Sequence, residues 1–140
     1  MKATFRIASL LLALLMLFAF VACADVEKTG VWENATHLSD KEFGKGNVTV
    51  TVKVEAEEQS VTFTIHTDKE TLGDALLEHD LIAGEEGPYG LYVKTVNGIL
   101  ADYDVDQTYW NFTKNGELMM VGIDGAAITD GECYELTRTK

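Results

Sequence analysis

Basic residues are scarce in this chain. It has 11 Lys and Arg against 23 Asp and Glu among 140 residues, which gives a formal net charge of −12. A polyanion of this density is repelled by nucleic acid and by anionic lipid head groups, so neither is expected as a partner. Solubility and cation binding are both compatible with the charge.

Recognisable catalytic motifs are also missing. After the N-terminal segment the only serines are Ser39 and Ser60, and neither lies in a G-x-S-x-G setting. No phosphate-binding loop or dinucleotide fingerprint occurs, and the three histidines lack a short metal-ligand spacing. We therefore expect a non-catalytic protein rather than an enzyme.

Only the N-terminus has a long apolar run. Residues 10–21 are all apolar. They follow the basic residues Lys2 and Arg6, and the small residue Ala22 separates them from Cys23. This arrangement is typical of an export signal. Residues 20–23, Phe-Val-Ala-Cys, resemble a bacterial lipobox, which predicts a lipoprotein signal peptide over residues 1–22 and lipidation of Cys23. The mature protein is then extracytoplasmic and anchored to the cell membrane, and simple cleavage with secretion is the alternative.

Cysteine is limited to Cys23 and Cys133. If Cys23 is lipidated, Cys133 has no partner, and the alternation in residues 133–136 predicts that Cys133 is buried in a strand. If Cys23 is not lipidated, a disulfide between the two becomes possible in an oxidising compartment.

One compact domain is expected over residues 47–140, preceded by a tether over residues 23–46 that packs partly onto it through Trp32 and Phe43. Period-two alternation predicts a hairpin with strands over 48–54 and 61–65. Residues 67–70 match the capping box T-x-x-E, and the apolar spacing that follows predicts a helix from Leu72 to about Leu81.

Further strands are predicted over residues 89–96, 109–112, 118–121 and 132–137. Asn97-Gly98 and Asn115-Gly116 are typical hairpin turns, and residues 99–107 form an acidic connection. The order of elements predicts an α+β fold of the β-grasp type, with a mixed sheet of about five or six strands packed on one helix and the last strand between earlier ones.

The segment Tyr109–Phe112 is rich in aromatic side chains. Alternation places Trp110 and Phe112 on one face of the strand and Tyr109 and Asn111 on the other. Two large rings side by side need a cover, which is either the protein's own core or a ligand. The sequence leaves these two alternatives open.

Three aspartates, Asp102, Asp104 and Asp106, alternate along the acidic connection. In an extended segment they lie on one side, and such oxygen clusters suit calcium. An EF-hand loop is excluded because its glycine and glutamate positions are taken by Gln107 and Thr113. A cation site and a solvated acidic loop are the two interpretations.

Four motifs in order resemble the C-terminal domain of transcobalamin and gastric intrinsic factor: residues 92–98, 108–112, 122–124 and 129–136. The chain is similar to the bacterial exported members of the transcobalamin C-terminal-like family over roughly residues 48–137. This resemblance implies a β-grasp fold that binds a soluble ligand.

In the vitamin carriers, the domain forms one wall of the cobalamin site. By position, the resemblance implies a ligand-binding set made of Trp110, Phe112, Leu118, Met119, Met120, Gly122 and Ile123. The carriers cover the other face of the vitamin with a helical barrel, which this chain lacks. A partner protein, a transporter or a second copy is then needed to complete the site.

Three functions therefore follow as expectations. The first is an extracytoplasmic lipoprotein that binds a small soluble ligand, cobalamin or another corrinoid among them. The second is a calcium-type cation-binding surface protein, and the third is a structural or adhesion module without a small ligand.

Overall fold

The computed structural model describes residues 25–140. The predicted signal peptide and Cys23 lie outside this range. Across residues 25–140, no helix is both long enough and apolar enough to cross a membrane. The buried core of residues 25–140 extends from Trp32 to Leu136, so this part of the chain has a hydrophobic core of its own.

The predicted hairpin is present as β2 (Val48–Ala56) and β3 (Gln59–Thr67), paired antiparallel along their full length. Its alternating apolar residues face the core, with Val52, Val54 and Phe63 fully buried. The turn places Glu57 and Glu58 at φ angles of 48° and 64°. Both φ values lie in the left-handed region that a tight hairpin turn needs.

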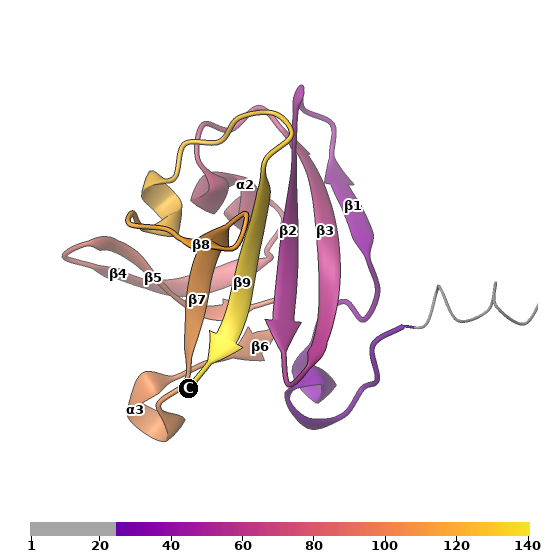
Figure 1. Cartoon of the computed structure of the whole chain (residues 1–140), viewed down its shortest axis with the longest axis vertical. Coiled ribbons are helices and arrows are strands. Elements are labelled where there is room, and N and C mark those ends of the chain that lie inside the picture. The colour runs from indigo at the N-terminus through magenta and orange to yellow at the C-terminus, as the bar shows by residue number, and fades with distance from the viewer. Residues whose placement is uncertain (1–24) are drawn as a thin grey trace, which may run out of the picture.

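The last strand, β9 (Cys133–Thr139), lies between β2 and β7 (Tyr109–Lys114), parallel to β2 and antiparallel to β7. With β1 (Lys41–Gly44) and β8 (Glu117–Leu118) at the edges, the sheet has the order β1-β3-β2-β9-β7-β8 (Figure 1). The predicted α+β class and the mixed six-stranded sheet are therefore confirmed. The predicted strand over 118–121 is shorter, because pairing with β7 ends at Leu118.

The helix α2 (Leu72–Glu78) buries Leu72, Ala75 and Leu76 in the core. The predicted capping box at residues 67–70 is wrong: Thr71 caps the helix by accepting a hydrogen bond from Asp74 N at 3.3 Å. Thr67 instead accepts a hydrogen bond from Lys69 N and ends β3. The helix also ends earlier than predicted, because Asp80 adopts a φ of 55° after the last turn.

A second, three-stranded sheet has the order β4-β5-β6, made by β4 (Ile82–Gly87), β5 (Gly90–Val96) and β6 (Ile99–Leu100). Strand β4 was not predicted, because its glycines are typical of turns. Gly84 follows a β-bulge, and a Cβ there would lie 2.0 Å from Tyr92 O. The glycine therefore permits close approach of two strands rather than a turn.

The expectation of an extended acidic connection over residues 99–107 is wrong. Residues 99 and 100 form β6, and residues 103–106 form the short helix α3 (Tyr103–Asp106). Asp102 caps this helix by accepting a hydrogen bond from Asp104 N at 3.1 Å. A helical turn places Asp104 on the side away from Asp102 and Asp106, so the three aspartates do not share one side as they would in an extended strand.

Residues 25–46 contact the domain extensively. The 3₁₀ helix η1 (Gly30–Asn34) buries Trp32 completely, and its Nε1 donates a hydrogen bond to Ala56 O at 2.8 Å. Strand β1 adds to the sheet edge in parallel with β3, and Phe43 packs edge-on against Phe63. The segment expected as a tether thus supplies both a core residue and an edge strand.

Replacing Trp32 with Phe should destabilise the protein by about 1–3 kcal/mol, because Ala56 O loses its buried donor. Urea unfolding followed by circular dichroism measures the loss. Tyr103→Phe, at an exposed site on α3, is the control and should change the free energy of unfolding by less than about 0.5 kcal/mol. Equal stability of the two variants would contradict a structural role for the indole nitrogen.

Candidate functional site

An open apolar groove of about 160 Å³ lies where the two sheets meet. Its lining comes from β5, β7, β9 and the segment that leads into the 3₁₀ helix η2 (Ile123–Gly125). The lining residues are Leu91, Tyr92, Val93, Trp110, Phe112, Val121, Gly122, Ile123 and Leu136. None of them carries a charge.

The two aromatic residues of β7 belong both to the core and to the groove. Trp110 is 8% exposed, and its Nε1 donates a hydrogen bond to Lys94 O at 3.1 Å, which joins β7 to β5. Phe112 is half-buried and stacks on Tyr134 of β9, with ring centroids 5.8 Å apart. The protein's own atoms cover most of each ring, and the uncovered part of each ring forms part of the groove wall.

A charged cluster fixes Tyr134 beneath Phe112. The Tyr134 hydroxyl donates a hydrogen bond to the Glu132 carboxylate, which also forms an ion pair with Lys114 Nζ at 2.8 Å. Burial raises the pKa of Glu132, but hydrogen bonds from Lys114, Tyr134 and Thr129 N outweigh burial, so its pKa lies below the usual 4.5. Burial and the Glu132 carboxylate raise the pKa of Tyr134. The phenol thus stays neutral under the stacked ring.

The opposite wall is held by Asp124. Its Oδ2 accepts a hydrogen bond from Leu91 N at 3.0 Å, which ties β5 to η2. Gly90 precedes Leu91 with a φ of 101°, and a Cβ there would lie 2.7 Å from both carboxylate oxygens. Glycine is therefore required for Asp124 to approach the strand this closely.

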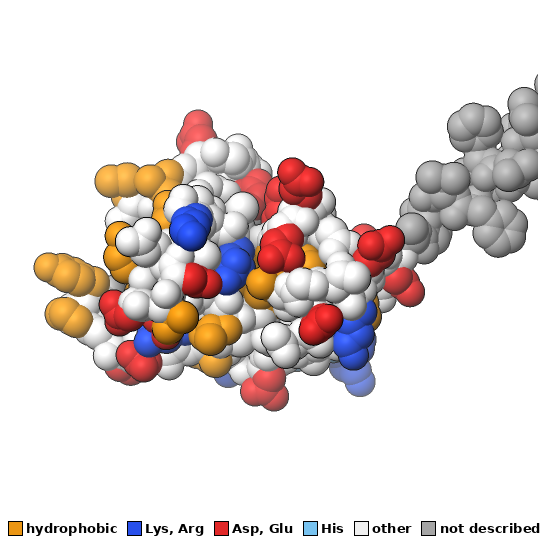
Figure 2. Space-filling view, turned by 90° about the horizontal axis from the view of Figure 1, so that it is seen from below, with side chains coloured by type: hydrophobic (Ala, Val, Ile, Leu, Met, Phe, Trp, Pro, Cys, Tyr) orange, Lys and Arg blue, Asp and Glu red, His pale blue; other side chains and the backbone are white. Residues whose placement is uncertain are grey.

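The groove has an exposed apolar rim. Tyr89 at the tip of the β4–β5 hairpin is 97% exposed, and Met120 is 91% exposed; Tyr92 and Val121 are about half exposed. Residues 87–93 and 118–123 contain no charged residue, although the whole chain carries −12. Hydrophobic side chains gather at the left end of the molecule in Figure 2, where Figure 1 places the hairpin tip. Exposed apolar surface of this kind marks binding sites.

The structure separates the residues that the resemblance grouped. Trp110, Phe112, Gly122 and Ile123 line the groove. Leu118 and Met119 line a different hollow with Lys114, Asn115 and Glu117, and Met120 lies on the rim. The predicted set did not include five lining residues: Leu91, Tyr92, Val93, Val121 and Leu136. The signal in the sequence for the first four is their place in the uncharged runs over residues 87–93 and 118–123.

The aspartates of α3 do not converge. Asp106 accepts hydrogen bonds from the Thr108 hydroxyl and backbone, which lower its pKa, and forms an ion pair with Arg138 at 3.1 Å. Asp102 serves as the helix cap. In the part of the chain described, no group of three or more His, Cys, Asp or Glu is placed to hold a metal ion.

Cys133 is exposed, so the prediction that it is buried is wrong. The alternation in β9 has the opposite phase, with Tyr134 and Leu136 facing the core. Pairing with β2 fixes this phase, because Tyr134 lies beside the buried Val52.

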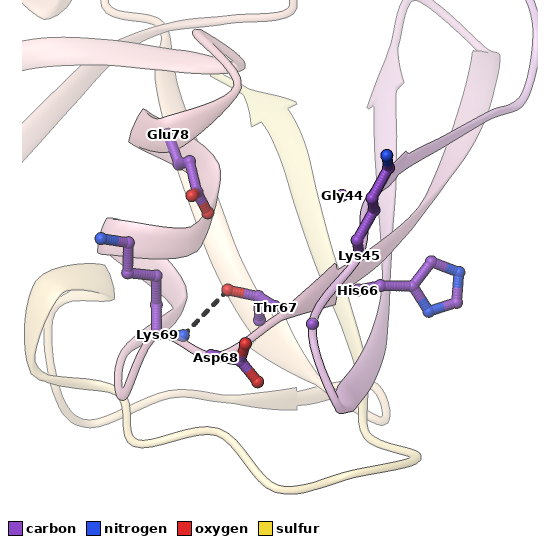
Figure 3. A pocket seen from close by; sticks show the side chains of 8 residues that line it. Gly44, Lys45, His66, Thr67, Asp68, Lys69 and Glu78 are labelled. Atoms are coloured by element: carbon purple, nitrogen blue, oxygen red, sulfur yellow. Dashed lines mark hydrogen bonds between the residues drawn. The ribbon is translucent and has the colours of Figure 1, made fainter.

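A second, polar cleft lies between the ends of β1 and β3 and helix α2 (Figure 3). It contains charged residues of both signs, among them Lys45, Lys69 and Glu78. Figure 3 shows these three side chains pointing in different directions rather than toward a common centre. The apolar groove is therefore the better candidate site.

Replacing Glu132 with Gln should reduce stability near neutral pH, and the difference from the unchanged chain should shrink as the pH falls below 4.5. The reason is that folding lowers the pKa of Glu132. The ionised Glu132 carboxylate therefore stabilises the fold at any pH above its unfolded-state pKa, and this stabilisation is lost as the pH falls through its folded-state pKa. Urea unfolding across this pH range measures the effect. Glu117→Gln, at an exposed carboxylate, is the control, and a difference independent of pH would contradict the assignment.

Known proteins share this fold. Residues 69–134 match the family described as Domain of unknown function (DUF4430). A Ruminococcus gnavus ATCC 29149 protein, solved as a "putative metal binding protein", is 35% identical with a TM-score of 0.64, and the match covers 67% of this chain and 98% of that one. No protein among curated sequences matches significantly.

Haptocorrin in complex with Cbi is also similar, with 20% identity and a TM-score of 0.58. The match covers 70% of this chain and 26% of that chain, so this chain spans about a quarter of haptocorrin and the likeness shows the fold alone. The expected resemblance to the transcobalamin C-terminal-like family is confirmed at the level of the fold. The apolar groove thus lies within a known type of domain, and the chain belongs to the DUF4430 family.

Proposed function

We propose that this protein is a non-catalytic binding protein that takes a small, soluble, largely apolar ligand at the groove and its rim. One observation carries the proposal: an uncharged groove with an exposed aromatic and methionine rim interrupts the surface of a strongly anionic chain. Concave apolar sites of this kind are typical of small-molecule binding.

A corrinoid is the candidate ligand. A corrin is a broad plate with an apolar face and polar amides at its edge, and thioether and aromatic groups contact such plates well. Met120, Tyr89 and Tyr92 present these groups around the groove. The fold shared with haptocorrin, which was solved with Cbi bound, supports this candidate.

The place of action follows from the N-terminal segment. Lipidation at Cys23 would hold the protein outside the cytoplasmic membrane, and cleavage without lipidation would release it. The groove is open on one side, so a partner protein, a transporter or a second copy would cover the exposed face of the ligand.

Cobalamin and cobinamide should each bind the 25–140 chain, and Val121→Asp should weaken binding by about tenfold or more, because it places a charge at an uncharged mouth. Isothermal calorimetry and the visible spectrum of the corrinoid measure binding. Val105→Asp, also at an exposed valine but on α3, is the matched control. Absence of binding to either corrinoid would remove this ligand and favour a structural or adhesion module.

Cation binding is the second candidate function, favoured by the name of the Ruminococcus gnavus protein. The residues proposed for it are Asp102, Asp104 and Asp106. Two of them are engaged already, Asp102 as a helix cap and Asp106 with Thr108 and Arg138. Asp104 and Asp106 are both exposed, and Asp104 is the one that takes part in neither of these contacts.

Calcium should leave the melting temperature of the 25–140 chain unchanged if the groove is the functional site. A cation that binds only the folded state raises the melting temperature. Differential scanning calorimetry with calcium and with magnesium at equal ionic strength tests this. A calcium-specific rise that Asp104→Asn abolishes, and Glu117→Asn does not, would favour the second candidate.

A further inference from the structure

We propose that the groove receives one neutral apolar group of the size of a benzene ring, and that the rest of the ligand lies across the rim. This inference rests on the proposed function and specifies which part of a ligand the site recognises. Three features of the groove carry it: its size, its uncharged lining and its fixed walls.

The size of the groove sets the size of the inserted group. Its volume is about 160 Å³. Dry apolar cavities of about 150 Å³ hold a molecule of benzene. A macrocycle is far larger, so it can only lie over the mouth, whereas a single ring or a branched aliphatic group fits inside.

The lining sets the charge of that group. The one indole N–H in the groove, Trp110 Nε1, already donates to Lys94 O. Leu91, Val93 and Leu136 offer only apolar contact. A charged group would lose its hydration without gaining a partner of opposite charge in the lining, which costs several kcal/mol. The groove therefore selects a neutral group.

The walls are fixed before a ligand arrives. On one side Asp124 holds Leu91 through a hydrogen bond, and on the other Phe112 stacks on Tyr134. Leu136 belongs to β9, which pairs on both sides within the large sheet. Enlarging the groove would break these contacts, so the preformed shape excludes bulkier groups.

The rim supplies the second contact region. Tyr89, Met120 and Val121 are exposed beside the mouth and belong to two uncharged segments. A ligand with one ring in the groove reaches these side chains with its remaining surface. Recognition thus has two parts, a small pocket that selects and a broad apolar surface that adds contact area.

Neutral fragments test the inserted part directly. Toluene, phenol, benzoate and 1-adamantanol are titrated into the ¹⁵N-labelled 25–140 chain, and the two indole N–H resonances are followed by NMR. Toluene and phenol should shift the Trp110 resonance. The Trp32 resonance is an internal control, because the Trp32 side chain of η1 is fully buried and should not move. Benzoate, which is charged, and 1-adamantanol, which is bulkier, should leave both resonances in place.

Two variants test whether the fragments bind in the groove. Val93→Phe fills the groove with a ring, and Val121→Phe narrows its mouth; each should weaken phenol binding by about tenfold. Val121 is half exposed, so this second variant keeps the test valid if Val93→Phe fails to fold. Val105→Phe on α3 is the matched control and should bind phenol like the unchanged chain.

The inference is overturned if neutral rings leave Trp110 unmoved, if benzoate binds as well as phenol, or if Val121→Phe binds phenol normally. Corrinoid binding without any fragment binding would keep the proposed function and overturn this inference. Fragment binding without corrinoid binding would support the inference and would indicate that the ligand is another molecule that carries a neutral ring.

Discussion

The pairing of β9 with β2 on one side and β7 on the other joins the two halves of the large sheet. The N-terminal hairpin brings most of the buried valines, and β7 brings the aromatic residues of the groove. Within residues 25–140, β9 is the strand that pairs with both of them. On the same strand, Leu136 lines the groove and Tyr134 stacks beneath Phe112. The pairing of β9 therefore both holds the large sheet together and positions two residues of the site.

Much of this architecture was predictable because local patterns agreed with it. The alternation of β2 and β3 and the Asn-Gly turns identified the strands, and the order of elements gave the central position of the last strand. The errors occurred where tertiary contacts decide. Gly84 permits a bulged strand to approach its neighbour, and pairing with β2 sets the phase of β9, which leaves Cys133 exposed.

The candidate site was predictable only in part. The aromatic strand and the resemblance gave Trp110, Phe112, Gly122 and Ile123, which all line the groove. The wall made by β5 could not be predicted, because it depends on how the small sheet packs against the large one. That packing rests on single contacts such as Trp110 with Lys94 and Asp124 with Leu91, and neither pair has a local signature in the sequence.

The first described residues and the tip of the β4–β5 hairpin lie at opposite ends of the molecule (Figure 1). A chain held at its N-terminal end would therefore turn the mouth of the groove toward the bulk medium. Diffusing molecules would reach it without obstruction from the surface behind, and a large neighbouring protein would have room to approach.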